Sequence, residues 1–279
     1  MSIFCDVAYS STIGAMSIIE SIILGLIQGL TEFIPISSSG HLVIAQYFMN
    51  GASDHLFLEW INLGTVLALL IYFRKRIWSA TIDVIKGKDY RLARNVIVAM
   101  LPAALMGFIF ASTIEESPFF GSVWTVVVTL FVVGVLLVVV ERLPKLSQVK
   151  DEVELPVSRA LTIGLIQVLA LIPGTSRSGS TIIAGRIMGL NAAKAAEFSF
   201  LVSIPIMLGV IAKLLLKSSD RAYLMDNLAP LAVSNTVAFI SGLIAVGFLM
   251  RYLEKRSLAI FGYYRIGLAL VLVGVLLLQ

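Results

Sequence analysis

The chain has 279 residues, of which 58% are hydrophobic and only 14% are charged, and its mean hydropathy is +0.97. A soluble domain carries about 25% charged residues, so this composition excludes an ordinary soluble protein and indicates an all-α polytopic membrane protein. The net charge of +4 does not indicate nucleic-acid binding, because the basic residues lie between apolar runs, and the single cysteine, Cys5, excludes an internal disulfide and a cysteine-based metal cluster.

In chain order, two interrupted apolar regions alternate with uninterrupted runs long enough to cross a bilayer. The interrupted regions cover about 17–49 and about 158–190. Full spans are predicted, to within a few residues, at 56–73, 93–111, 122–140, 197–216, 231–250 and 260–278. We therefore predict one membrane domain over residues 1–279 with six transmembrane helices.

Pro35 and Pro173 divide the two interrupted regions. Proline removes a backbone donor and stops a helix, and the Ser- and Gly-rich residues that follow allow a new helix to begin. Each half is only about 11 to 15 residues long, too short to cross the hydrocarbon, so we interpret both regions as re-entrant helical hairpins. The alternative is a kinked but complete transmembrane helix.

The resulting order is a hairpin and three spans, repeated once. Because three is odd, the second unit enters the membrane from the opposite side. This predicts an inverted-topology repeat, with repeat one over about 17–141 and repeat two over about 158–279. In such repeats the hairpin tips approach each other near the midplane of the bilayer.

Loop charge predicts the orientation of the chain. If both hairpins return to the side from which they entered, sixteen Lys and Arg residues face one side, and Lys217 and Arg221 face the other with the acidic pair Glu115 and Glu116. The positive-inside rule makes the basic side cytoplasmic. Both termini would then lie outside, with the first hairpin open to the outer face. If either hairpin were a complete span, the basic loops would divide between the two sides. Residues 1–73 lack Lys and Arg, so we expect no signal peptide.

The first interruption carries Gln28, Glu32 and the run Pro35-Ile36-Ser37-Ser38-Ser39-Gly40-His41. Gln28 and Glu32 are four residues apart and share a helix face. Ser38 and His41 are three apart, which places a potential nucleophile beside a potential base. An intramembrane carboxylate beside a helix break is usually functional. The alternative is that the serines only cap the second half-helix and His41 only binds a backbone carbonyl.

The second interruption reads Pro173-Gly174-Thr175-Ser176-Arg177-Ser178-Gly179-Ser180-Thr181. Two helix N-termini directed at one spot form an anion site, and with Arg177 they offer a charge of roughly +2. A phosphate monoester carries nearly −2 at neutral pH. Glu32 opposes such a ligand unless a divalent cation lies between them or it serves as a proton acceptor. A buried guanidinium needs an anionic partner, and in the empty site Glu32 is the candidate partner of Arg177. This set favours phosphoryl-transfer chemistry.

Outside the motifs, Asp54, His55 and Glu59 are expected at the outer interface without a chemical role. Lys213 and Arg265 lie near the ends of apolar runs, and their side chains are expected to extend to the membrane interface.

These residues resemble the undecaprenyl-diphosphate phosphatases of the bacitracin-resistance type. That family has a first motif (Glu/Gln)-x-x-x-Glu, followed by Pro-x-Ser-Ser-(Thr/Ser)-Gly-His, and a second motif Pro-Gly-x-Ser-Arg-Ser-x-x-Thr. Both motifs are present here, from Gln28 to His41 and from Pro173 to Thr181. The resemblance covers nearly everything after the first fifteen or so residues. Gln28 stands where many members have Glu, so it cannot supply charge to a metal.

The resemblance implies hydrolysis of undecaprenyl diphosphate to the monophosphate and phosphate in the bacterial plasma membrane. The implied catalytic residues are Glu32, Ser38, His41 and Arg177. The implied substrate-binding residues are Gln28, Ser37, Ser39, Gly174, Thr175, Ser176, Ser178 and Thr181. A divalent cation, Mg²⁺ or Ca²⁺, is implied as cofactor, with Glu32 as its ligand. The expected partners are the polyprenyl diphosphate substrate and membrane lipids, with a homodimer as a candidate assembly and no nucleic acid.

Two questions stay open at this stage, the attacking group and the class of function. In one mechanism Ser38 attacks the terminal phosphorus while His41 or Glu32 accepts its proton, and in the other Glu32 activates a water molecule that attacks directly. The architecture also suits a secondary transporter or a flippase of polyprenyl phosphate. An acid-phosphatase-type lipid phosphatase is set aside, because that type needs a catalytic His after the Ser-Arg element and His55 is the only His that follows His41.

Overall fold

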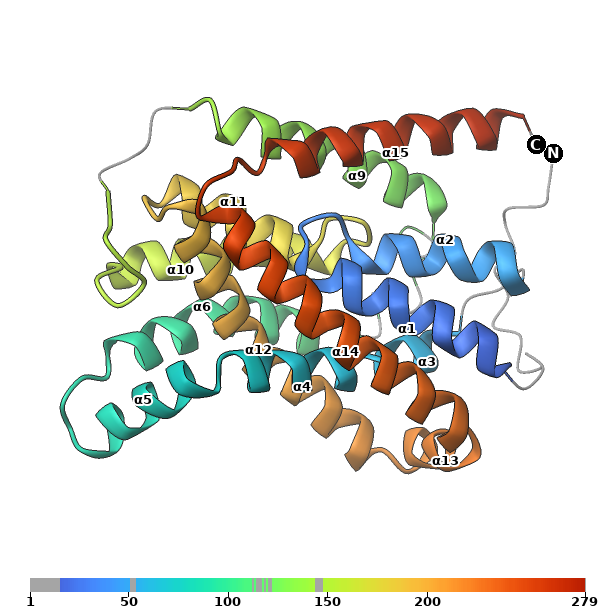
Figure 1. The fold of residues 1–279 in the computed structure, drawn as a ribbon, viewed down its shortest axis with the longest axis horizontal. Coiled ribbons are helices and arrows are strands. Elements are labelled where there is room, and N and C mark those ends of the chain that lie inside the picture. Colours follow the sequence, from blue (N-terminus) through green and yellow to red (C-terminus); the bar gives the residue numbers. More distant parts are fainter. Residues whose placement is uncertain are drawn as a thin grey trace.

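The computed structural model describes residues 16–50, 54–111, 122–143 and 148–278, together with 113, 117 and 119. Within these residues the chain is helical and contains no strand, which confirms the predicted all-α class (Figure 1). Cys5, Glu115, Glu116 and Lys145 lie outside the described residues. The helices are α1 (Ile18–Phe33), α2 (Ser38–Asn50), α3 (His55–Trp60), α4 (Asn62–Tyr72), α5 (Arg74–Ile85), α6 (Arg91–Ile109), α9 (Val123–Val140), α10 (Val157–Gln167), α11 (Arg177–Ile187), α12 (Ala192–Leu216), α13 (Ser218–Asp226), α14 (Leu228–Leu253) and α15 (Ala259–Leu277), with a short 3₁₀ helix η1 (Val168–Leu171) after α10.

Five of the six predicted spans are continuous apolar helices long enough to cross a membrane: α6, α9, α12, α14 and α15. Large apolar side chains lie exposed along their outer faces, including Phe108 on α6, Ile244 on α14 and Val271 on α15. Side chains of this kind on an outer face are suited to contact with hydrocarbon. The protein is therefore a multi-pass membrane protein.

The predicted span 56–73 consists of two consecutive helices separated by Ile61. α3 ends at Trp60, and α4 begins at Asn62, whose side-chain amide donates back to the carbonyls of Leu58 and Glu59, at 2.9 and 3.2 Å. Such local bonds compete with the helical ladder. After Phe73 the chain bends by 69° into α5, which the hydrophobic pattern did not predict. The bend between α4 and α5 lies where the basic run Arg74-Lys75-Arg76 begins.

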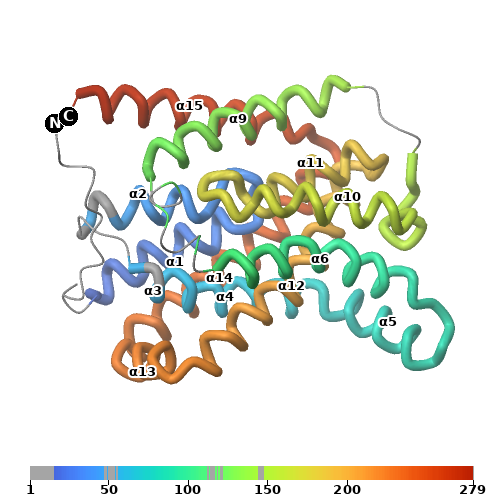
Figure 2. The backbone as a smooth tube through the Cα atoms, turned by 180° about the vertical axis from the view of Figure 1, so that it is seen from behind, coloured from blue at the N-terminus to red at the C-terminus, as the bar shows by residue number. Residues whose placement is uncertain are grey.

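The predicted breaks at Pro35 and Pro173 are confirmed. The first divides α1 from α2 and the second divides α10 and η1 from α11, and in each case the two parts pack against each other. Figure 2 shows both connecting segments near the middle of the molecule. We name residues 34–37 the first turn and residues 172–176 the second turn.

Glycine contacts set the distance between the half-helices and their neighbours. A Cβ at Gly25 of α1 would lie 2.6 Å from the carbonyl oxygen of Ser234 in α14, and one at Gly164 of α10 would lie 2.5 Å from that of Ala99 in α6. Only glycine permits backbones to approach this closely. The repeated Gly-Leu-Ile-Gln pattern therefore serves packing at its first residue in both regions.

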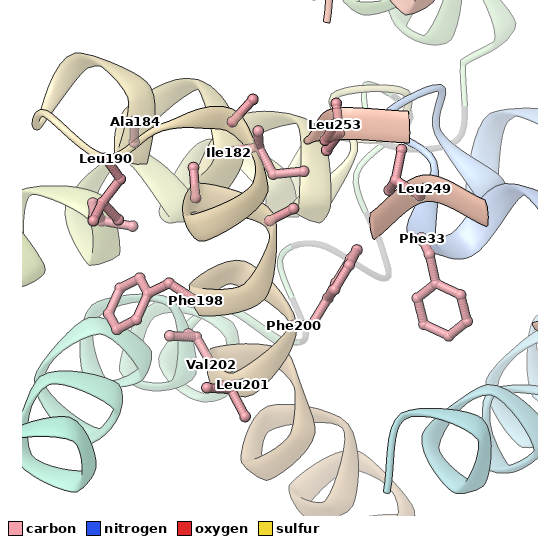
Figure 3. Packing of buried hydrophobic residues seen from close by; sticks show 14 of the residues in the cluster. Phe33, Ile182, Ala184, Leu190, Phe198, Phe200, Leu201, Val202, Leu249 and Leu253 are labelled. Atoms are coloured by element: carbon pink, nitrogen blue, oxygen red, sulfur yellow. The ribbon is translucent and has the colours of Figure 1, made fainter. Parts of the chain in front are cut away.

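A core of aromatic and aliphatic side chains holds the end of α1 in place (Figure 3). The ring of Phe33, the last residue of α1, lies edge-on to Phe200 of α12, with the ring centroids 5.6 Å apart. Leu249 and Leu253 of α14 and Ile182 of α11 belong to the same cluster. Since Glu32 directly precedes Phe33, this packing also fixes the carboxylate.

Candidate active site

The two turns have the same backbone design. Ser37 and Ser176 both adopt left-handed backbone conformations, with φ of 75° and 73°. Each precedes a new helix, and the hydroxyl of each accepts a hydrogen bond from the amide three residues later, that of Gly40 at 3.4 Å and that of Gly179 at 3.1 Å. Non-glycine residues seldom adopt positive φ, and such positions are concentrated at functional sites. The serines at these two positions therefore cap the helix starts through one amide each, and the amides of the first two residues of each helix are not used by the cap.

Glu32 lies where the two turns meet. Its Oε1 accepts a hydrogen bond from Nη2 of Arg177 at 2.5 Å, and its Oε2 accepts one from the hydroxyl of Ser38. The hydroxyl of Ser178 donates to the main-chain carbonyl of Glu32 at 3.3 Å. The Glu32 and Arg177 side chains are 11% and 21% exposed, so the pair is largely removed from solvent. The prediction that Arg177 and Glu32 pair in the empty site is confirmed.

Polar side chains from α1 and α4 support the carboxylate. The amide nitrogen of Gln28 donates to Oε2 of Glu32 at 3.3 Å and to Oδ1 of Asn62 at 2.8 Å, and it lies 3.5 Å from the hydroxyl of Thr65. Gln28 is buried, so it orients Glu32 from behind. The motifs did not point to Asn62 or Thr65. A polar pair within an apolar stretch was the available signal.

The structure does not join Ser38 to His41 as the sequence suggested. Nδ1 of His41 lies 2.7 Å from the carbonyl oxygen of Ser37, and Nε2 lies 2.8 Å from the hydroxyl of Tyr264. A carbonyl can only accept, so Nδ1 carries the hydrogen and Nε2 accepts from Tyr264. No hydrogen bond found between the described residues connects His41 with Ser38, whose hydroxyl is bonded to Glu32. Among these groups, Glu32 is the one placed to accept the Ser38 proton.

The remaining predicted binding residues occupy distinct places. Ser39 is exposed beside the first turn, with its Oγ 3.3 Å from that of Ser37, and Ser176 and Ser178 form the matching pair at 3.1 Å. Gly174 has a φ of 83°, and a Cβ there would lie 2.1 Å from the hydroxyl oxygen of Thr129. Thr175 is buried in the second turn. Thr181 is also buried, and its hydroxyl donates to the carbonyl of Arg177 and lies 2.5 Å from the hydroxyl of Ser199. Thr181 thereby ties α11 to α12.

The expectation that Arg265 extends to the membrane interface is wrong. Its side chain is 0% exposed, and it donates to the carbonyls of Pro35 and Gly174, at 3.3 and 2.6 Å. Arg265 thus lies between the two turns. The sequence did contain a signal, since an arginine within an apolar run is a functional candidate by default.

The number of carboxylates in the site limits how the implied divalent cation could bind. Among the described residues there is no group of three His, Cys, Asp or Glu side chains arranged to hold a metal ion. Glu32 is the one predicted ligand, and its carboxylate oxygens contact the Arg177 guanidinium, the Ser38 hydroxyl and the Gln28 amide. Mg²⁺ commonly binds through one or two carboxylates together with substrate phosphates, so Glu32 would be the protein carboxylate that holds such a cation.

Comparisons with known proteins place this geometry in a family. The family model described as "Bacitracin resistance protein BacA" matches residues 21–271. An undecaprenyl-diphosphatase of Clavibacter michiganensis is 40% identical over 270 residues, which cover 94% of this chain and 97% of the relative. The undecaprenyl-diphosphatase 1 of Agrobacterium fabrum is 40% identical over 268 residues, with 95% and 99% covered. The undecaprenyl-diphosphatase 1 of Clostridioides difficile is 37% identical over 270 residues, with 94% and 97% covered. The chain therefore belongs to the BacA family of bacitracin resistance proteins.

Proposed function

We infer that this protein is a membrane-embedded phosphatase that hydrolyses undecaprenyl diphosphate to undecaprenyl phosphate and phosphate, a reaction that recycles the lipid carrier of peptidoglycan synthesis and gives resistance to bacitracin. The single observation that carries this inference is the Glu32 carboxylate, which bridges Ser38 and Arg177 at the junction of two helix starts. The family and the names of its related undecaprenyl-diphosphatases give the substrate.

In the proposed mechanism the terminal phosphate of the substrate takes the place of Glu32 on Arg177. The free amides at the starts of α2 and α11 and the Arg177 guanidinium then hold its oxygen atoms. Ser38 Oγ attacks the terminal phosphorus while Glu32 accepts its proton. The bond from that phosphorus to the bridging oxygen breaks, and the lipid leaves as the monophosphate. Water then cleaves the phosphoserine and releases phosphate.

Two further parts complete the proposal. A divalent cation, when bound, would offset negative charge between Glu32 and the diphosphate. The ring of His41 is held by Ser37 and Tyr264 beside the same helix start, which suits it to bind a phosphate oxygen or to pass a proton to the leaving group.

We also propose the membrane arrangement: six spans, two re-entrant hairpins and an inverted repeat. The pairing of helices supports it, because α1 packs on α14 as α10 packs on α6, and α9 packs on α15. When the two proposed repeats are exchanged, the α1–α14 pair becomes the α10–α6 pair, and the α9–α15 pair is unchanged. The basic loops support an active site that opens to the outer face of the plasma membrane.

The orientation is tested by accessibility in intact cells. Single cysteines are introduced in place of Ser39, beside the first turn, and of Lys88, after α5, in a chain whose Cys5 is replaced by Ser. A membrane-impermeant thiol reagent should modify the cysteine at position 39 and spare that at position 88 until the cells are opened. The reverse pattern contradicts the proposed orientation.

The activity is tested with purified protein in detergent and a long-chain prenyl diphosphate. The wild type should release phosphate where no gradient exists, which a transporter or flippase would not do. Arg177→Ala should lower the rate by about 100- to 1,000-fold, because the guanidinium holds the transferring group. Arg91→Ala, which removes an exposed guanidinium paired with Asp89, is the matched control and should keep the wild-type rate. Full activity in Arg177→Ala would refute the proposal, and an added chelator tests the cation separately.

A further inference from the structure

Arg265 of α15 is a completely buried guanidinium whose acceptors are all main-chain carbonyls. Nη1 donates to Pro35 in the first turn at 3.3 Å. Nη2 donates to Gly174 at 2.6 Å and to Thr175 at 3.3 Å in the second turn. Nη2 and Nε also lie 3.3 Å from the carbonyl oxygens of Thr129 and Leu130 in α9. One side chain therefore contacts both turns and a separate helix.

The positive charge of Arg265 has no carboxylate to neutralise it. Among the described residues, no ion pair involves Arg265, whereas Arg177 is paired with Glu32. A buried charge without a counter-charge is costly, and carbonyl dipoles compensate it only in part. An ionisable side chain within a membrane segment marks a substrate or ion site by default, so a charged ligand is the candidate partner for this charge.

The location of this charge points to the ligand. A Cβ added at Gly179, in the first turn of α11, would lie 3.6 Å from Nη1 of Arg265, so the guanidinium lies beside the helix start that carries Arg177. In the empty site Glu32 and Arg177 cancel. Arg265 and the two helix ends leave about +2, which matches the charge of a bound phosphate or diphosphate group.

The shape of the side chain explains why this residue is an arginine. A guanidinium is planar and has five N–H donors with fixed directions, so it can bind carbonyls of several segments at once. A lysine ammonium has the same charge but three donors and no plane. Replacement by lysine therefore retains the charge and loses part of the connection between the turns.

We propose that Arg265 is a positioning residue of the phosphatase site, which fixes the two turns against each other and supplies the positive charge that a bound diphosphate neutralises. The proposal rests on the proposed function for its substrate class. It adds to the site a residue of α15, which lies outside both sequence motifs.

The experiment compares Arg265→Lys, Arg265→Gln and Arg265→Met with the wild type in detergent. A displacement of reacting groups by about 1 Å costs roughly 100-fold in rate, so Arg265→Met should lower kcat by about that factor. Arg265→Lys should retain more activity than Arg265→Gln, because it keeps the charge. KM for the lipid diphosphate and the inhibition constant of inorganic pyrophosphate should rise in Arg265→Gln and Arg265→Met.

Leu272→Ala is the matched control for a loss of packing. Leu272 is buried on the same helix, in the cluster that α15 forms with α9. This variant should lower the thermal stability while KM and pyrophosphate inhibition stay at the wild-type values. A purely structural role for Arg265 would give the same pattern in the Arg265 variants and would overturn the proposal.

Two further outcomes also support or refute the proposal. If Arg265→Gln and Arg265→Met do not fold, Arg265→Lys is the test, and wild-type kcat and KM in that variant refute the proposal. If the wild type releases no phosphate, the proposed function fails, and thermal stabilisation by pyrophosphate is compared instead. A wild type stabilised by pyrophosphate more than Arg265→Lys supports the role of Arg265, and equal stabilisation overturns it.

Discussion

The two turns share one backbone and divide the chemistry between them. Equivalent positions are 139 residues apart, as Ser37 and Ser176 are, and both turns place a serine with positive φ before a new helix. Ser38 is the first residue of the helix after the first turn and Arg177 is the first residue after the second, and both side chains contact Glu32. The comparison teaches that the same helix start occurs twice, once with a hydroxyl and once with a positive charge beside the Glu32 carboxylate.

The glutamines that precede the two turns differ in their hydrogen bonds. Gln28 is bonded to Glu32 and Asn62, whereas the buried Gln167 has no hydrogen-bond partner for either polar atom among the described residues. The positions that correspond to Asn62 and Thr65, again 139 residues later, hold Leu201 and Ile204. The second half of the chain thus lacks, at these positions, the polar side chains that bind the amide of Gln28 in the first half.

The largest expected effect comes from removing the reactive hydroxyl. Ser38→Ala should lower kcat by at least about 10,000-fold if Ser38 is the nucleophile, because nucleophile deletions in covalent catalysis cost that much or more. Phosphate release by the purified variant is the measurement. Ser219→Ala, in α13, is the control with the same chemical change. A loss of only about tenfold would instead favour attack by water activated at Glu32.

Replacement of the carboxylate should have the next largest effect. Glu32→Gln keeps the shape of the side chain but removes the proton acceptor, and general-base catalysis contributes about 100- to 10,000-fold. We expect a loss of kcat in that range, with Glu254→Gln at the wild-type rate. If Glu32→Gln kept full activity and His41→Ala had none, the proton acceptor would be His41.

A smaller effect is expected for the phenol that orients His41. Tyr264→Phe removes the hydrogen bond to Nε2, and one hydrogen bond contributes about 0.5–1.5 kcal/mol, which corresponds to a loss of roughly two- to tenfold in kcat. Tyr263→Phe is the neighbouring control, since the Tyr263 hydroxyl only accepts a bond of 3.4 Å from Arg142. Equal rates in the two variants would show that the His41 orientation does not depend on Tyr264.

The smallest change in activity is expected at Gln167. Gln167→Leu removes a buried amide without a partner, so the free energy of unfolding should rise by about 1 to 3 kcal/mol while activity stays within twofold. Gln28→Leu should have the opposite result, with lower activity and no gain in stability. Thermal unfolding in detergent and phosphate release measure the two properties. A destabilised or inactive Gln167→Leu would mean that this amide binds a group that the comparison of the two turns does not explain.

Local chemistry made much of the fold predictable. Pro35 and Pro173 stop helices for covalent reasons, and the long apolar runs of α6, α9, α12, α14 and α15 are helical spans because hydrocarbon requires internally satisfied backbone groups. The split between α3 and α4 was not predictable from apolar content, because it accompanies hydrogen bonds of the Asn62 side chain to the preceding carbonyls. The pairing of Ser38 with Glu32 rather than with His41 was also missed, since helix spacing gives neighbours but not side-chain directions.

The sequence by itself determined where the chain breaks, which residues are candidates for the chemistry and to which family the protein belongs. Those properties follow from residue type and short spacing. Only the tertiary structure decided that Glu32 connects Ser38 with Arg177, and that Arg265 lies buried between the turns instead of at the membrane interface. The physical reason is that these contacts join residues far apart in the chain, so they exist only where the packing of α1, α11 and α15 places the donors within reach of the acceptors.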